Sequence, residues 1–181
     1  MNQVQNGNLP IRIMFQDEAR FGRISDPKAC WSPGGFRPSI GAQMIREYIY
    51  IYGAVSPQDG KHNSLVLPRA NTETMSIFLS EVSRRHQNEH IVMFTDQAGW
   101  HTSKWLKVPS NIELAFLPPY SPELNPQEQI WDELREKFFA NKIFKSLDAV
   151  MDNAVKALQA LEWLPDKIKS ISHRAWILNP A

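Results

Sequence analysis

The sequence predicts an α/β protein, in which helices pack on the faces of a sheet. Three observations carry this prediction: strand-like runs come first, strands and a helix then alternate, and helical patterns fill the last third of the chain. Elements in this order are typical of a sheet covered by helices. Strands joined through a helix should run parallel, and functional sites in such sheets gather beyond the carboxyl ends of the strands.

The first part of the chain contains three predicted strands. Residues 11–16, IRIMFQ, alternate in the way of a half-buried strand. Residues 46–55, REYIYIYGAV, are rich in β-branched and aromatic side chains, and residues 64–67, SLVL, follow a turn as a short strand. Between the first two strands, residues 22–39 are rich in Gly and Pro, which predicts a hairpin or a long loop.

A change of period marks the next elements. One helical face, with Asn71 or Thr72 as its cap, is predicted by four apolar residues at i, i+3, i+4 and i+7, namely Met75, Phe78, Leu79 and Val82. Two short apolar runs, residues 90–95 and 112–117, predict further strands, the first covered on both faces. Three helices are then expected, from Asn125 to about Asn141, from Leu147 to about Trp163, and after Pro165.

Length and composition limit the class of protein. The 181 residues are 43% hydrophobic and 22% charged, as expected for one globular domain, which we place at residues 11–181. Residues 1–10 are polar and are expected to be frayed or disordered. No apolar run approaches the roughly 20 residues that cross a membrane, and the N-terminus lacks the pattern of a secretory signal. With Cys30 as the one cysteine, the sequence predicts a cytoplasmic protein without an internal disulfide.

Two aspartates come directly after predicted strands. Asp17 follows the first strand, and Asp96 follows residues 90–95. Aspartate at the end of a strand is rigidly placed and still accessible, as a metal ligand must be. Either residue alone could simply begin a turn, because aspartate favours such positions. Since both are expected beyond the carboxyl end of a strand, we predict that they lie close together.

The third acidic residue, Glu128, lies in a proline-rich segment, residues 117–131, LPPYSPELNPQEQIW. Asn125 is expected to cap a helix in which Glu128 takes the third position. A glutamate there can reach back to the N–H of the cap residue, which gives it an alternative, structural role. Glu128 also flanks the apolar stripe of this helix. The prolines would then fix the approach of the helix so that this carboxylate meets the two aspartates.

Three carboxylates in one cleft must bind cations or take up protons. Two like charges about 4 Å apart repel by about 4 kcal/mol at an effective dielectric constant near 20. An all-carboxylate set of ligands suits Mg²⁺ or Mn²⁺, and the five histidines and single cysteine show no spacing typical of a zinc site. Two such ions about 3.5–4 Å apart stabilise the attacking and leaving oxygens of phosphoryl transfer, which is the chemistry of nucleases and strand transfer.

The segments FQDEARFG, FTDQAGWHTS and LPPYSPELNPQEQIWDELR together resemble the three signature blocks of the DDE transposases, in particular the mariner-related branch of bacterial insertion sequences. The segment CWSPGGFRPS is similar to the loop between the first two strands of that family. The resemblance covers roughly residues 11–139. It implies a ribonuclease H-like fold, with a mixed five-stranded sheet flanked by helices and an insertion after the first strand. It also implies that Asp17, Asp96 and Glu128 are the catalytic and metal-binding residues.

The resemblance further implies a reaction and partners. DNA would be nicked at transposon ends, and a DNA 3′-hydroxyl would then attack a target phosphodiester. Family members carry helix-turn-helix modules ahead of the catalytic domain. No such module fits before the first strand here, so a separate helix-turn-helix subunit is a possible partner, as is a second copy in a homodimer. With a net charge of +1, the chain is expected to bind DNA weakly.

The sequence departs from the family pattern at three points. Gln97 follows the second aspartate where many relatives have Asn, and Gln127 precedes the glutamate where they often have an aliphatic residue. Residues 97–127 also make the spacing between Asp96 and Glu128 slightly short. None of these departures removes a carboxylate, so they bear on activity more than on ancestry.

Further residues near the acidic cluster in sequence are candidates for contact with DNA: Arg20, Arg23, His101 and Lys104. His101 could equally orient a water or make a hydrogen bond within its loop. Glu18 should point away from Asp17 because side chains alternate along a strand, so a solvated or structural role is expected. Two other functions stay open: a nuclease of this fold that cuts without joining, and an inactive relative that serves as an interaction module.

Overall fold

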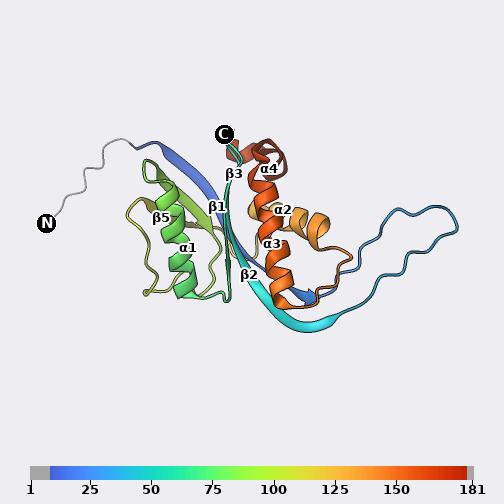
Figure 1. Ribbon diagram of the computed structural model, residues 1–181. Coiled ribbons are helices and arrows are strands. Elements are labelled where there is room, and N and C mark those ends of the chain that lie inside the picture. Colours follow the sequence, from blue (N-terminus) through green and yellow to red (C-terminus); the bar gives the residue numbers. More distant parts are fainter. Residues whose placement is uncertain (1–8, 179–181) are drawn as a thin grey trace.

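The computed structural model describes residues 9–178, and Figure 1 shows a sheet with helices on both faces. The elements are β1 (Ile11–Ile24), β2 (Met44–Ser56), β3 (Lys61–Leu67), α1 (Thr72–Arg85), β4 (His90–Thr95), β5 (Ile112–Phe116), the 3-10 turn η1 (Pro122–Leu124), α2 (Gln127–Leu134), the π turn η2 (Arg135–Phe139), α3 (Leu147–Glu162), α4 (Pro165–Ser172) and α5 (Ala175–Leu178). Most of the predicted fraying at residues 1–10 concerns residues 1–8, which lie outside the described residues.

The five strands form one mixed sheet in the order β3-β2-β1-β4-β5. Strand β2 pairs antiparallel with both β1 and β3, whereas β4 pairs parallel with β1, and β5 pairs parallel with β4. The central strand is therefore β1. Its parallel pairing with β4 stops at Phe15, near the middle of β1. This topology confirms the predicted α/β class and all five predicted strands.

Two predicted elements differ in length. The first strand does not end before Asp17 but continues to Ile24, because its second half pairs with β2. The helix predicted from Asn125 to about Asn141 is regular only as α2 and then widens into the π turn, in which the Ala140 N–H donates to the Arg135 carbonyl at 2.7 Å. The helix over residues 147–163 is confirmed as α3, with Ser146 as its cap.

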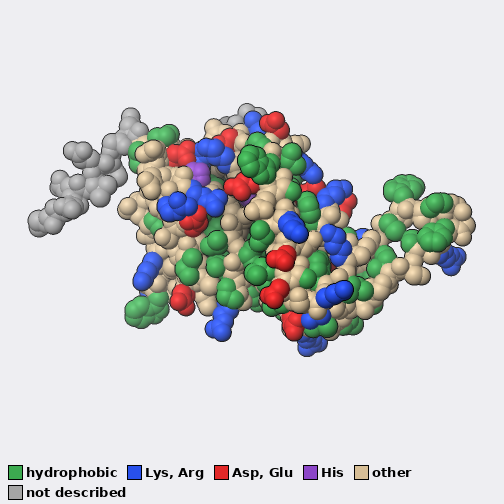
Figure 2. Space-filling view, viewed as in Figure 1, with side chains coloured by type: hydrophobic (Ala, Val, Ile, Leu, Met, Phe, Trp, Pro, Cys, Tyr) green, Lys and Arg blue, Asp and Glu red, His purple; other side chains and the backbone are tan. Residues whose placement is uncertain are grey.

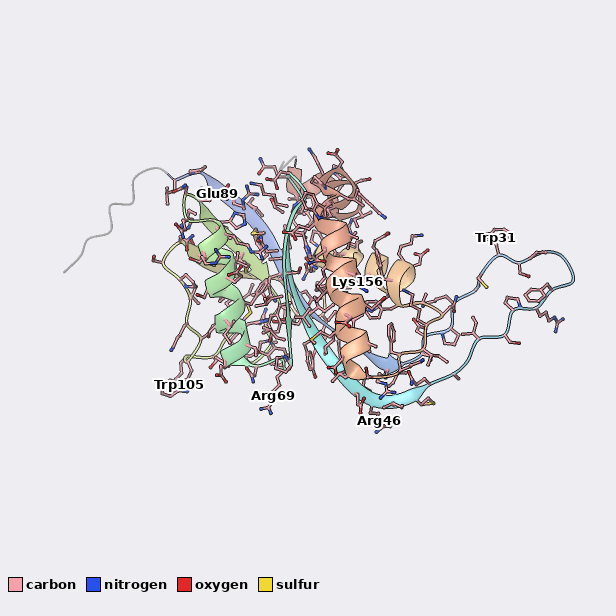
Figure 3. All side chains as sticks on the ribbon, viewed as in Figure 1. Trp31, Arg46, Arg69, Glu89, Trp105 and Lys156 are labelled. Atoms are coloured by element: carbon pink, nitrogen blue, oxygen red, sulfur yellow. The ribbon has the colours of Figure 1, made fainter. Side chains whose placement is uncertain are left out.

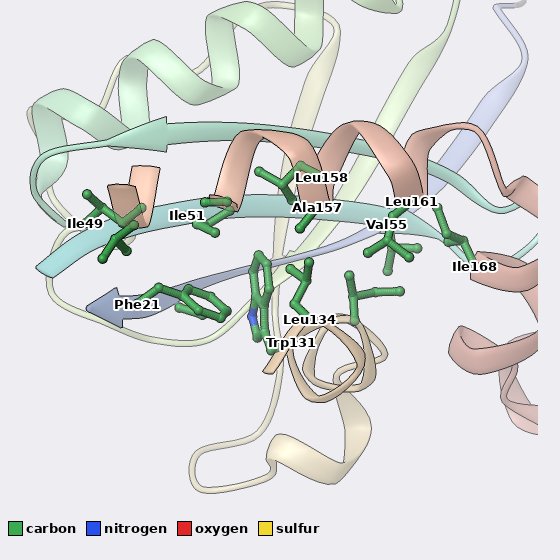
Figure 4. Packing of buried hydrophobic residues seen from close by; sticks show 14 of the residues in the cluster. Phe21, Ile49, Ile51, Val55, Trp131, Leu134, Ala157, Leu158, Leu161 and Ile168 are labelled. Carbon is green, nitrogen blue, oxygen red and sulfur yellow. The ribbon is translucent and has the colours of Figure 1, made fainter. Parts of the chain in front are cut away.

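The sheet divides the apolar core into two clusters. One lies between the sheet and α1, where Phe78 and Leu79 face Met14 of β1. The other lies between the sheet and α2, α3 and α4, and Figure 4 shows Trp131 of α2 against the strands of this cluster. Trp131 is fully buried, so α2 is held tightly on the sheet. The start of this helix carries Glu128.

The segment between β1 and β2, residues 25–43, projects from the body of the protein (Figure 1). Figure 2 shows hydrophobic side chains gathered on this projection, and Trp31 and Phe36 are both exposed. The predicted long loop is thus confirmed, and Cys30 lies exposed on it. Within residues 9–178, the helices are all too short or too polar to cross a membrane.

Candidate active site

The three predicted acidic residues line one hollow of about 410 Å³ at the surface. Asp17 enters it from the middle of β1, Asp96 from the residue after β4, and Glu128 from the first turn of α2. The rest of the wall comes from the turn after β4 and from the proline-rich segment, residues 117–122. Residues far apart in the sequence therefore share one site.

The sheet register places the two aspartates side by side. The last parallel pair between β1 and β4 is Phe15 with Phe94, and each aspartate lies two residues further along its own strand. Beyond this pair β4 ends at Thr95, which still pairs with Phe116 of β5, whereas β1 continues in its hairpin with β2. The first aspartate thus has a rigid strand on both sides of it, and the second begins a turn.

Glu128 is brought to the site by a buried asparagine. The Asn125 Nδ2 donates to the Gln16 carbonyl at 2.9 Å, and its Oδ1 accepts from the Gln127 N–H at 3.1 Å. One side chain therefore joins the start of α2 to the residue before Asp17. The capping-box alternative for Glu128 is not formed, because the Asn125 N–H donates to the Pro122 carbonyl at 2.9 Å.

A glycine lets the helix approach the sheet closely. Gly53 of β2 is the residue paired with Asp17 across the hairpin. A Cβ atom at this position would overlap the Gln127 amide and would lie 2.6 Å from the Trp131 ring. The Trp131 Nε1 also donates to the Asp17 Oδ2 at 2.8 Å. The bare backbone at Gly53 thus leaves room for the helix that orients this aspartate and carries Glu128.

The electrostatics of the three acids differ. Burial and then the nearby charge of Glu128 raise the pKa of Asp17 to about 7, although the Trp131 N–H opposes the shift. Burial likewise raises the pKa of Glu128, against the attraction of Arg135. The pKa of Asp96 is lowered, mainly by a hydrogen bond from His101. A nearby cation would therefore stabilise the charged forms of Asp17 and Glu128, whereas the charged form of Asp96 is already stabilised by His101.

The donors at this site suit Mg²⁺ or Mn²⁺, because both ions prefer carboxylate oxygens. The carboxylates that the hollow gathers, with two raised pKa values, are what a site for a hard cation requires. In residues 9–178 as they stand, no three His, Cys, Asp or Glu side chains converge closely enough to hold a metal ion. Two of the acids face protein donors, since Asp17 accepts from Trp131 and Asp96 accepts from His101 and from the Ala98 N–H.

Of the four candidates for DNA contact, two are exposed. The Arg20 guanidinium lies 4.5 Å from the centre of the Tyr48 ring on the β1–β2 hairpin. Lys104 lies 5.2 Å from the centre of the Trp105 ring, and Figure 3 shows Trp105 projecting from the surface beside α1. Both cations can reach a phosphate outside the protein.

The other two candidates have structural partners instead. Arg23 donates to Glu47 and to the carbonyls of Phe144 and Lys145, which fixes the hairpin to the segment before α3. The side chain of His101 is fully buried, with Glu18 on one ring nitrogen and Asp96 on the other. Both side chains thus make hydrogen bonds within the protein, and their contact with DNA stays a prediction.

The sequence analysis missed the partnership of Glu18. Its side chain does point away from Asp17, as alternation predicts, but it is 6% exposed and accepts from the His101 Nε2 at 2.9 Å. The available signal was the face of the strand: Met14 and Gln16, which share that face with Glu18, are both buried. A charged residue next on a buried face needs a partner.

Comparisons with known proteins agree with this architecture. A family model described as DDE superfamily endonuclease matches residues 12–151. A protein of Sinorhizobium fredii, the uncharacterized protein y4pE/y4sA, is 46% identical over 130 residues, which are 71% of this chain and 96% of that protein.

Two solved structures are similar over most of the chain. The Mos1 strand transfer complex matches with a TM-score of 0.60 and 17% identity, over 89% of this chain and 53% of that one. The Mos1 mariner paired end complex with Mn matches with a TM-score of 0.60 and 16% identity, over 92% and 55%. The chain thus spans about half the length of the Mos1 chains. The shared fold is the ribonuclease H-like one that the sequence predicts.

Proposed function

We propose that this chain, which belongs to the family of DDE superfamily endonucleases, is a transposase catalytic domain that cuts DNA and joins its 3′ ends to a target with the help of divalent metal ions. We assign Asp17, Asp96 and Glu128 as the catalytic, metal-binding residues. The observation that carries the assignment is their meeting in one hollow, where burial raises the pKa of Asp17 and of Glu128 and the charge of Glu128 adds to the shift at Asp17.

Asp17 and Glu128 are held in place by different contacts. Trp131 orients Asp17 through one carboxylate oxygen, and the rigid hairpin fixes its backbone. Asn125 and the close packing over Gly53 determine where Glu128 lies. When bound, Mg²⁺ or Mn²⁺ would activate the attacking oxygen and neutralise charge on the leaving oxygen. The protein supplies the fixed carboxylates, and Pro118, Pro119 and Pro122 line the hollow beside them.

DNA as the substrate is supported by chemistry and by likeness. The Mos1 structures include a paired-end complex with the left transposon end, and others with Mn and with Mg. For this chain we propose that Arg20 and Lys104 contact DNA phosphates, because both side chains are exposed. Since the net charge is only +1, we further propose that a separate helix-turn-helix subunit selects the DNA ends and that two copies act together.

A Mn²⁺-dependent nicking assay on labelled DNA tests the assignment. Asp96→Asn and Glu128→Gln each remove one charge with little change of shape, and we expect nicking to fall by about 10³-fold or more, equivalent to about 4 kcal/mol. The matched control is Asp132→Asn, an exposed acid four residues after Glu128 on α2, which should nick like the wild type. Equal nicking by wild type and Glu128→Gln would contradict the assignment.

A joining assay on a plasmid target separates transposase from plain nuclease. We expect the wild type to attach a labelled DNA 3′ end to the plasmid and both acid variants to fail. Nicking without joined product would reduce the function to that of a nuclease. Absence of both products, together with no binding of Mn²⁺ in calorimetry, would support the third alternative, an inactive interaction module.

A further inference from the structure

We propose that His101 is a positioning residue that holds the Asp96 carboxylate ready for a metal ion, and that Glu18 in turn orients His101. The inference rests on the proposed function of Asp96. Its basis is a continuous chain of contacts: the His101 Nδ1 donates to the Asp96 Oδ1 at 2.6 Å, and its Nε2 donates to the Glu18 Oε1 at 2.9 Å.

The turn after β4 is shaped to bring these residues together. The Ala98 N–H donates to the Asp96 Oδ1 at 3.0 Å, and the Ala98 carbonyl accepts from the His101 N–H at 2.9 Å. The chain therefore folds back so that the imidazole lies beneath the aspartate five residues earlier. The Thr95 hydroxyl, 3.0 Å from the same ring nitrogen, completes the pocket.

The three side chains in this chain of contacts differ in exposure to solvent. The side chains of His101 and Glu18 are 0% and 6% exposed, whereas that of Asp96 is 59% exposed. Within residues 9–178 the imidazole is thus shielded from solvent, and its hydrogen bond toward the hollow goes to the Asp96 carboxylate. A buried ring held by two acids, of which one is exposed at the site, acts on that site through the exposed acid.

This arrangement has a chemical purpose at a metal site. Carboxylates that bind metals are themselves hydrogen-bonded by surrounding groups, and loss of such a group lowers metal affinity by about 10- to 100-fold. Here two donors fix one oxygen of Asp96, so the carboxylate cannot rotate freely about its bond. Glu18 is needed because an imidazole with a single partner could turn away from Asp96.

A purely structural role for His101 makes a different prediction, and two amide substitutions separate the two. An asparagine amide nitrogen can take the place of Nδ1, whereas a glutamine amide nitrogen can take that of Nε2. His101→Asn therefore keeps the bond to Asp96 and loses the one to Glu18. His101→Gln does the reverse. A brace for the fold needs both bonds, but a positioning residue depends mainly on the bond to Asp96.

The experiment measures Mn²⁺ affinity by calorimetry on the full chain without DNA, together with unfolding in denaturant without metal. We expect His101→Gln to bind Mn²⁺ about 10- to 100-fold more weakly than the wild type, and His101→Asn within about threefold of it. If either variant fails to fold, Glu18→Gln, which keeps the shape of its side chain, is expected to weaken binding by about threefold to tenfold at unchanged stability.

Two controls keep the outcomes distinct. Wild type that binds Mn²⁺, Asp96→Asn that does not, and His101→Gln with wild-type affinity would overturn the role of His101 and leave the proposed function intact. Equal weakening in His101→Asn and His101→Gln, in step with lost stability, would likewise overturn it in favour of a brace. Unchanged affinity in Asp96→Asn would instead overturn the proposed function.

Discussion

Two polar clusters lie on the same strand, five residues apart, and they are built in opposite ways. At the start of β1, Arg12 donates to both oxygens of Glu89 at 2.7 and 2.8 Å and to both oxygens of Asp59 at 2.8 and 3.0 Å. The arginine side chain is only 9% exposed. Two acids thus share one arginine through four hydrogen bonds, and His86 adds a bond on Glu89 at 2.6 Å.

In the middle of the same strand the charges do not balance. Asp17 and Glu128 face each other with the neutral Trp131 N–H as the hydrogen-bond donor to Asp17. The pKa values express the contrast. The bond from Arg12 lowers the pKa of Glu89 to about 2, whereas burial and Glu128 raise the pKa of Asp17 to about 7.

The difference teaches what each cluster is for. Acids that accept hydrogen bonds from a shared arginine are stable as they stand, because both carboxylates are bonded to a positive charge. Acids that are buried together without a hydrogen bond from a base lower the stability of the protein, and a chain keeps such a group where function requires it. By this criterion the Arg12 cluster is structural, and the hollow around Asp17 fits the metal site that we propose.

The largest expected effect comes from removing the base of the matched cluster. Arg12→Met removes the base that two partly buried acids share, so we expect the free energy of unfolding to fall by about 3–5 kcal/mol. Asp17→Asn removes an unmatched charge and should instead raise it by about 1 kcal/mol at pH 8. Denaturant unfolding of both variants in EDTA measures the two effects.

Arg12→Lys serves as the control, because it keeps the charge and loses the bidentate geometry. Its loss of stability should lie between those of the wild type and Arg12→Met. The contrast between the clusters would fail if Arg12→Met and Asp17→Asn changed stability in the same direction.

The second prediction concerns the cation itself. At a free Mn²⁺ concentration of 100 times its Kd, the free energy of unfolding should rise by about 2.7 kcal/mol, because the ion binds the folded chain. Asp17→Asn should remove most of this gain, whereas Arg12→Lys should keep it in full. Unfolding curves with and without Mn²⁺ provide the measurement, and equal stabilisation of both variants would place the ion elsewhere.

Local patterns in the sequence predicted most of the fold. The Asn71 cap, the strand that ends before Asp96 and the helix over residues 147–163 depend on near neighbours, and the structure has all three. The full length of β1 could not be predicted in this way, since it follows from pairing with β2. The assignment of Asp17, Asp96 and Glu128 as catalytic remains a prediction, although they do line one hollow.

The hydrogen-bond partners of Arg23 and Glu18 could not be predicted from the sequence either, because both partners are distant along the chain. Arg23 bonds the Phe144 carbonyl 121 positions away, and Glu18 bonds His101 83 positions away. Alternation along a strand predicts the face on which a side chain lies but not the residue that it contacts. The sequence therefore predicted DNA contact for Arg23 and a solvated or structural role for Glu18, without naming the partner of either residue.

The third prediction tests the packing that brings the unmatched acids together. Gly53→Ala adds a methyl group against the buried Trp131 ring and the Gln127 amide, so the start of α2 must shift. We expect a loss of about 1–3 kcal/mol in unfolding free energy and reduced Mn²⁺-dependent nicking, although every carboxylate is retained. Gly34→Ala is the matched control, because no atom lies within 4 Å of the added carbon. Wild-type nicking by Gly53→Ala would show that Glu128 does not depend on this contact.

The smallest effect concerns pH and a buried histidine beneath the same helix. Burial lowers the pKa of His62 to about 4, against a hydrogen bond with Gln127 that raises it. The unfolded chain, with a histidine pKa near 6.5, binds a proton between pH 6.5 and 4 that the folded chain does not. His62 therefore reduces stability as the pH falls through this window. The raised pKa of Asp17 acts in the opposite direction, since its folded form holds the proton up to about pH 7.

A difference measurement separates these opposing effects. Between pH 8 and pH 6, in EDTA, His62→Gln should lose about 1 kcal/mol less unfolding free energy than the wild type, because only the wild type must keep this imidazole neutral. Asp17→Asn should lose more unfolding free energy than the wild type over the same range, because it lacks the carboxylate that takes up a proton below about pH 7. Its greater stability relative to the wild type should therefore be seen mainly at pH 8. If both variants kept the pH dependence of the wild type, the two groups would have ordinary pKa values, and the charge imbalance assigned to this half of β1 would be wrong.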